Sequence, residues 1–218
     1  MNSLKVRRQK PETFTPTVTP PARPLPILRE WFIGWKVGNL VLDTANQRIM
    51  FFQIIWDGII AGPYGAQAVA ECNHSPWHKA PHDGCRCGFN AFSDRPRAVQ
   101  YANGLSASGA CIESVVTLRV GLKGRAIEGI HTVSDHRWGY RAEEQVVTDV
   151  FIPRACFSCD AAVVGFTLRR CSVHENQFAG MHYANAACSK HRGEQGTTLA
   201  QMRAHAAKDN ITIRWSDE

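Results

Sequence analysis

Cysteine and histidine residues gather in two short windows of the 218-residue chain, and this grouping constrains the fold more than any other feature. The first window runs from Cys72 to Cys87, and the second runs from Cys156 to His191. Neighbours such as Cys85 and Cys87 are too close together to pair with each other without strain. In a chain without an export signal, such clusters are typical of metal sites. We therefore expect small folded units held together by zinc.

The second window contains knuckles, in which two soft ligands flank a tight turn as structural zinc requires. One knuckle is Cys156-x-x-Cys159. Either of two later pairs with equal spacing can complete the tetrahedron. We favour the last pair because a predicted helix and strand follow it directly, as in treble-clef-like units. The favoured pair is Cys188 and His191, and the alternative pair is Cys171 and His174.

The first window offers a less regular set of ligands. Cys85 and Cys87 form a Cys-x-Cys pair, a less common ligand spacing than Cys-x-x-Cys. Cys72 supplies a third thiolate. His78 is the favoured fourth ligand, with His82 as its main rival. The sequence therefore predicts a second zinc ion, held by Cys72, His78, Cys85 and Cys87.

Catalytic zinc needs an open coordination position and a nearby general base. Zinc-dependent base deaminases use His-x-Glu followed by Pro-Cys-x-x-Cys. Here two residues separate Pro153 from Cys156, and no His-x-Glu precedes them. Phosphate-loop, His-Glu-x-x-His and Gly-x-Ser-x-Gly motifs are also missing from the sequence. We expect structural zinc and name no catalytic residue, and an enzyme with an unrecognised site remains an alternative.

The net charge of the chain indicates which kind of partner it binds. The formal net charge of +6 favours phosphate-rich partners through counterion release. One segment alternates basic and aromatic residues, an arrangement that holds unpaired bases by stacking. We therefore expect a nucleic-acid-binding protein for DNA or RNA, and the alternative is a phage or bacterial protein–protein adaptor acting on host machinery. The expected contact residues are Arg137, Trp138, Tyr140 and Arg141.

Hydrophobic residues make up 44% of the chain and charged residues 20%, as in ordinary soluble proteins. The longest apolar run, from Ile49 to Ile60, is interrupted by Gln53 and Asp57 and is shorter than the roughly 20 residues that span a bilayer. Pro, Thr and Glu follow the basic first residues, where a signal peptide needs an apolar core. We expect a cytoplasmic protein without a membrane span.

Three regions are expected along the chain, giving an α+β fold. Residues 1–28 hold six of the eleven prolines and predict a disordered, basic, Pro-rich arm. Residues 29–153 predict a β-rich domain with an embedded zinc loop at 72–88. Residues 154–218 predict a small zinc-ribbon or treble-clef-like unit. Strands are expected at 31–43, 48–56, 114–120, 125–130, 140–152 and 211–215, with a hairpin between the third and fourth, and helices at 94–105 and 198–208.

Three separated motifs resemble those of a group of uncharacterised actinobacterial and actinophage proteins. The motifs are Gly34-Trp35-Lys-Val, His78-x-Ala80-Pro81-x-x-x-Cys85-x-Cys87-Gly88 and Gly139-Tyr-Arg-Ala-Glu143. Several of those proteins are similar in ending with a Cys-x-x-Cys and a Cys-x-x-His pair. The resemblance covers about residues 31 to 215, and this chain departs from it at Phe89-Asn90 and in a long insertion before Cys188. It implies the same ligand choice and transfers no activity.

Overall fold

The computed structural model describes residues 23–24, 28–54, 60–72, 77–83, 85, 87–107, 114–128, 139–170 and 180–218. Its strands are β1 (Arg23–Pro24), β2 (Leu28–Asp43), β3 (Arg48–Ile54), β4 (Ile60–Tyr64), β5 (Gln67–Val69), β6 (Phe89–Phe92), β7 (Val115–Glu128), β8 (Gly139–Ile152), β9 (Gly165–Arg170), β10 (Met181–Ala187), β11 (Thr197–Thr198) and β12 (Thr212–Trp215). The helices are α1 (Arg95–Ala107), α2 (Ser189–Arg192) and α3 (Leu199–Ala207). The described part is therefore mostly β-sheet, as the sequence predicted.

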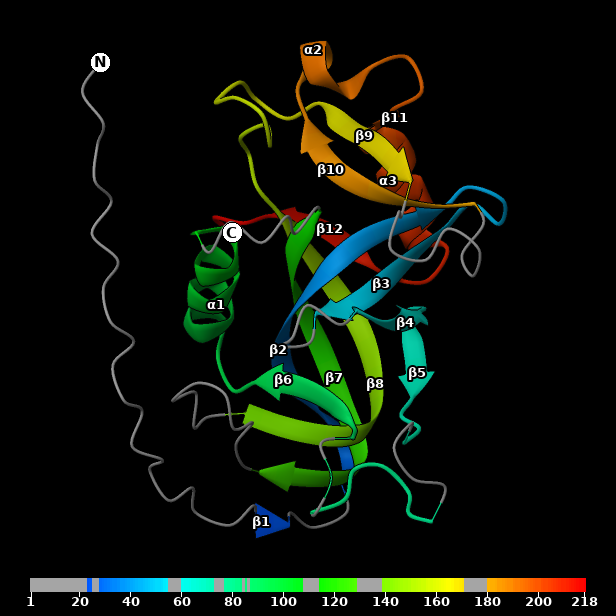
Figure 1. Ribbon diagram of the computed structural model, residues 1–218, viewed down its shortest axis with the longest axis vertical. Helices are drawn as coiled ribbons and strands as arrows, with labels where there is room; N and C mark the ends of the chain where they lie inside the picture. Colours follow the sequence, from blue (N-terminus) through cyan, green and yellow to red (C-terminus); the bar gives the residue numbers. More distant parts are fainter. Residues whose placement is uncertain are drawn as a thin grey trace, which may run out of the picture.

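Three long antiparallel strands, β2, β7 and β8, form the spine of the sheet (Figure 1). Alternate side chains of β7 point into the core, where Leu118, Val120 and Leu122 are fully buried. This period of two is what a strand with one covered face requires. The spine places β6 and β5 beside β8, so the loop between them lies against β8.

The predicted hairpin is wrong, because Val115–Glu128 form the single strand β7, and residues 129–130 lie outside the described residues. The two glycines that suggested a turn serve other purposes. A Cβ atom on Gly121 would lie 2.9 Å from Cγ1 of Val146, so glycine allows close approach of the neighbouring strand. Gly124 has a φ of +78°, which glycine adopts readily, and it lies at a shift in the register with β8.

One hydrophobic core joins the two predicted folded regions. Met202 and Ala206 of α3 are fully buried in the same core as Leu118 of β7 and Phe166 of β9. The sheet is also continuous, because β10 pairs with β2 and β12 pairs in parallel with β8. The predicted boundary near Pro153 therefore does not interrupt the sheet.

The predicted N-terminal arm meets the sheet at β1, where Arg23 and Pro24 lie opposite Glu128 and Ile127 of β7. Residues 1–22 and 25–27 of that arm lie outside the described residues, and residue 28 begins β2. None of the helices in the described part of the chain has the length and apolar content that crossing a bilayer requires.

Both longer helices begin where the sequence predicted. A carboxylate oxygen of Asp94 accepts a hydrogen bond from the backbone N–H of Arg97 at 3.0 Å, which caps α1. Thr198 and Gln201 form a reciprocal capping box at the start of α3. Such caps satisfy backbone N–H groups that have no partner within the helix.

Candidate metal centres

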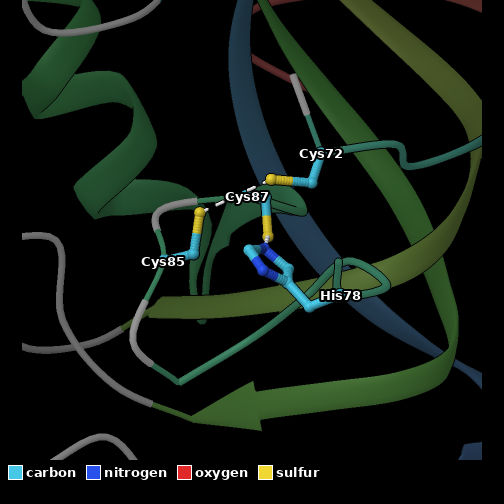
Figure 2. A group of neighbouring side chains, drawn as sticks. All are labelled: Cys72, His78, Cys85 and Cys87. Carbon is cyan, nitrogen blue, oxygen red and sulfur yellow. Dashed lines mark hydrogen bonds between the residues drawn. The ribbon is translucent and has the colours of Figure 1, made fainter. Parts of the chain in front are cut away.

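Four side chains of the loop between β5 and β6 converge on one point, as Figure 2 shows. We call Cys72, His78, Cys85 and Cys87 the first cluster. The sulfurs of Cys72 and Cys85 are 3.6 Å apart, and the sulfur of Cys87 is 3.4 Å from Nε2 of His78. All four ligand atoms lie within 4.8 Å of one another.

These separations fit a tetrahedral metal ion. With bonds of about 2.3 Å to sulfur and 2.0 Å to nitrogen, a tetrahedron places two sulfurs about 3.8 Å apart and a sulfur and a nitrogen about 3.5 Å apart. The sulfurs of Cys72 and Cys85 are much farther apart than the roughly 2.05 Å of a disulfide. The first cluster can therefore hold one metal ion through three thiolates and one imidazole.

Arg141 of β8 ties the loop of the first cluster to the sheet. This side chain is only 3% exposed. Its Nη1 donates to the carbonyl oxygens of His82 at 3.2 Å, Cys87 at 3.4 Å and Cys85. The backbone N–H of Cys85 donates to the carbonyl of His82 at 3.0 Å, which closes a turn just before the Cys-x-Cys pair. The guanidinium thus fixes the backbone that carries two of the four ligands.

A second arginine holds the start of the same loop. Nη2 of Arg125, on β7, donates to the carbonyl oxygen of Ala80 at 2.9 Å. Nε of Arg125 in turn lies 3.4 Å from the carboxylate of Glu143 on β8. Gly88, directly after the last ligand, has a φ of +110°, and a Cβ atom there would lie 2.9 Å from Cβ of Pro81. Glycine is needed at this position because the loop folds back closely on itself.

Burial raises the pKa of the Cys87 thiol to about 12, and a hydrogen bond with Cys85 acts in the same direction. Without a cation in the first cluster, this thiol therefore keeps its proton at neutral pH. A metal ion must displace that proton to bind the sulfur, so metal binding at the first cluster is coupled to proton release.

The second cluster consists of Cys156, Cys159, Cys188 and His191, and its ligand atoms also lie within 4.8 Å of one another. Nδ1 of His191 is 3.3 Å from the sulfur of Cys156 and 3.5 Å from the sulfurs of Cys159 and Cys188. The sulfurs of Cys159 and Cys188 are 3.8 Å apart. These distances again match the roughly 3.5 Å (sulfur to nitrogen) and 3.8 Å (sulfur to sulfur) of a tetrahedral site.

Two tight turns build the second cluster. In the first, the N–H of Cys159 donates to the carbonyl of Cys156 at 3.2 Å. In the second, the N–H of His191 donates to the carbonyl of Cys188 at 3.1 Å, and Cys188 is the N-cap residue of α2. The N–H of Phe157 donates to the carbonyl of Ala186 at 2.9 Å, which anchors the first turn to β10. Spacing within each turn thus sets the ligand geometry.

The thiol of Cys156 differs from that of Cys87. Burial acts to raise the pKa of Cys156, but hydrogen bonds from the backbone of Cys188 and Ser158 and from the side chain of His191 lower it to about 6. This sulfur is therefore largely a thiolate at neutral pH, which is the form that binds a metal ion.

The structure brings together each favoured ligand set. His82, the rival of His78, lies outside the first cluster, and its ring stacks on that of His78 at 4.4 Å between centroids. Cys171 and His174, the rivals at the second cluster, lie outside the described residues. Each cluster has four protein ligands, so a tetrahedral ion bound by all of them has no open position for a substrate.

The structure describes two of the four residues expected to contact nucleic acid, and both pack against other parts of the protein. Arg137 and Trp138 lie outside the described residues. Tyr140 packs edge-to-face against Phe32 at 4.9 Å between ring centroids. Arg141 is buried beneath the loop of the first cluster. Sequence reasoning missed this supporting role, because alternating Arg and aromatic residues look the same on an exposed strand and on one covered by a loop.

A feature that sequence reasoning also missed is the exposed ring of Phe157 between the first two ligands of the second cluster. The only sequence signal was an aromatic residue inside a Cys-x-x-Cys knuckle. Comparisons with protein-family models, with curated proteins and with solved structures found no match.

Proposed function

We propose that the chain is a nucleic-acid-binding protein in which both clusters hold structural zinc. Three thiolates and one imidazole form a soft donor set, and tetrahedral geometry with such donors is typical of Zn²⁺. All four ligands at each site come from the protein, which leaves a tetrahedral ion no open position for water or substrate. These features support a role for the metal in fixing the fold.

The C-terminal region is proposed to be a treble-clef-like zinc unit. Its support is the order of its parts, in which a Cys-x-x-Cys turn precedes β9 and β10 and a second turn opens into α2. Such a unit needs little core of its own, because the metal supplies folding free energy directly. The zinc unit is expected to present α2 and β9 as a rigid surface.

The observation that carries nucleic-acid binding is a basic surface fixed by the second cluster. We define this basic surface by Arg169, Lys190 and Arg192. Arg169 and Lys190 are exposed. The guanidinium of Arg169 lies over the ring of Phe157, and Lys190 directly precedes His191, whose ring also contacts Phe157. Fixed cations of this kind attract phosphates and release counterions.

Arg192 is held in place by two glycines. A Cβ atom on Gly165 would lie 2.9 Å from Cδ of Arg192, and Cγ of Arg192 lies in the space that a Cβ atom on Gly196 would need. Nε of Arg192 is buried without a hydrogen-bond partner, whereas the residue as a whole is half-buried. The two glycines thus leave room for the stem of Arg192, which adds a third cation to the basic surface.

Fluorescence anisotropy with labelled single- and double-stranded DNA and RNA tests the proposal. We expect binding that weakens about 20-fold between about 50 and 200 mM salt, as for three phosphate contacts on a single strand. The double variant Arg169→Glu, Lys190→Glu should lose binding. Its matched control, Lys123→Glu with Lys208→Glu, has the same net charge and should retain binding. Absence of binding to all four nucleic acids at low salt overturns the proposed function.

A second candidate function is that of a protein–protein adaptor. It is favoured by exposed apolar side chains on strands β2 and β5. Trp31 and Ile33 on β2 and Val69 on β5 are all exposed. Rows of exposed apolar side chains on one sheet commonly mark protein interfaces. If the adaptor function is correct, a defined partner should bind the wild-type protein and be lost with Ile33→Glu, while the Lys190→Glu variant still binds it.

A further inference from the structure

Phe157 lies at the tip of the first turn of the second cluster and is 43% exposed. The backbone of Phe157 is held in place, because its N–H donates to the carbonyl oxygen of Ala186 and the preceding residue, Cys156, belongs to the second cluster. The ring is therefore held at the surface by the same contacts that build the metal site. A single exposed apolar residue needs no functional reason on its own. The side chains around the Phe157 ring indicate a function for its exposure.

Two side chains frame the ring. The guanidinium of Arg169 lies 5.3 Å from the ring centroid of Phe157, in the range of a cation–π contact. The ring of His191 meets it edge-on, at 6.4 Å and 66°. Because His191 is a ligand of the second cluster, a bound metal fixes this neighbour as well. The ring is thus held in place, with the guanidinium of Arg169 over it and 43% of the residue exposed to solvent.

We propose that Phe157 is a stacking platform for an unpaired base, and that the second cluster therefore recognises single-stranded nucleic acid. This inference rests on the proposed nucleic-acid function and names its substrate class. A base stacked on an aromatic ring must first leave its own stack, which a single strand allows and a duplex opposes. The base stacks on the face of the ring that the guanidinium of Arg169 does not cover, and Arg169 can contact the phosphate next to that base.

The platform accepts any base, because each base has a π face, and so it gives no preference between DNA and RNA by itself. Cytosine, uracil and thymine stack as purines do, although less strongly. Short deoxythymidine and uridine oligonucleotides are therefore suitable probes, since they form little structure of their own. We expect the metal-loaded protein to bind both more tightly than it binds a duplex of equal length.

The test compares Phe157→Ala with a control of equal exposure. Val164, in the same unit, is also 43% exposed and lies outside the cluster, so Val164→Ala removes a comparable apolar group. We expect Phe157→Ala to weaken binding of the deoxythymidine oligonucleotide at least about 10-fold, within the range found for lost base stacking. Val164→Ala should change it less than about twofold. Metal content of both variants must match the wild type, which shows that the unit remains folded.

The Phe157→Trp variant adds a direct readout of stacking. Its fluorescence should be quenched by the single-stranded oligonucleotides and unaffected by the duplex. The inference is overturned if the wild type binds nucleic acid while Phe157→Ala binds single strands equally well, or if Phe157→Trp binds without quenching. If the wild type binds no nucleic acid, the proposed function itself fails, so the two failures are distinguishable.

Discussion

The guanidinium of Arg141 and the carbonyl oxygen of His82 lie 3.2 Å apart, although the two residues are separated by 59 positions in the sequence. This contact joins a strand of the spine to the loop of the first cluster. Three thiolates and a divalent ion carry one net negative charge, and the buried arginine places one positive charge beneath them. Arg141 therefore contributes both hydrogen bonds and charge balance to the first cluster.

Replacing Arg141 should empty the first cluster. Arg141→Met leaves the carbonyls of His82 and Cys87 without their donor, so we expect the free energy of unfolding to fall by about 3 kcal/mol. Metal content should fall from two ions per chain to one. Arg141→Lys, which retains a charge and donors, should recover part of both losses. Arg203→Met removes an exposed arginine whose guanidinium lies 5.9 Å from the ring centroid of Trp215, so it should leave the metal content unchanged and lower the free energy of unfolding by less than about 1 kcal/mol.

The two clusters should differ in how quickly they release metal. Cys159 of the second cluster is exposed, whereas none of the three cysteines of the first cluster is: Cys72 and Cys85 are half-buried and Cys87 is buried. A competing chelator or a thiol-modifying reagent should therefore take the ion from the second cluster first. A colorimetric metal assay should show two phases, and Cys156→Ser should abolish the fast one. A single phase for the wild-type protein would contradict this difference.

Gly165 and Gly104 should respond oppositely to alanine. At Gly165 a Cβ atom would meet the carbonyl of Thr197 and lie 3.0 Å from Cα of Thr198, and backbone atoms cannot move away easily. We expect Gly165→Ala to lower the free energy of unfolding by about 2 kcal/mol. Nothing lies within 4 Å of the same position at Gly104, in α1, so Gly104→Ala should raise it by about 0.5 to 1 kcal/mol. Urea unfolding of the two variants checks both signs.

Stability should rise with pH above neutrality because of Lys36. Burial lowers the pKa of this lysine from 10.5 to about 7, and its Nζ donates to Oε1 of Gln145 at 2.9 Å. Between those two pH values the unfolded chain binds more protons than the folded one, so raising the pH favours folding. The slope should reach at most about 1.4 kcal/mol per pH unit.

Urea unfolding between about pH 7 and 9.5 measures the Lys36 effect, and this range stays below the ionisation of tyrosines in the unfolded chain. Lys36→Met should flatten the dependence. Lys208→Met, at an exposed lysine, should leave it unchanged. A wild-type protein whose stability does not change across this range would show that Lys36 does not carry the effect.

The sequence alone predicted which side chains converge, because spacing within a turn determines their geometry. Cys156-x-x-Cys159 and Cys188-x-x-His191 need only local backbone structure to converge, and among the described residues it is His78 that the structure brings together with the cysteines of the first cluster. Helix starts were predictable for the same local reason, since Asp94 caps α1 and Thr198 caps α3.

Features that depend on distant parts of the chain were not predictable. Gly121 signals a turn in the sequence, but it lies within β7 because Val146 of the neighbouring strand needs the space. The role of Arg141 depends on a loop more than 50 residues earlier in the chain. The continuity of the sheet past Pro153 likewise depends on the pairing of β12 with β8, which no local pattern shows.

The most direct test of zinc at both clusters is the zinc content of the purified 218-residue chain, measured by inductively coupled plasma mass spectrometry without added metal. We expect two zinc ions per chain, one for each cluster. The content should fall to one in Cys72→Ser and to one in Cys156→Ser. Protein that is folded and contains no zinc, or that keeps two zinc ions in both variants, would contradict it.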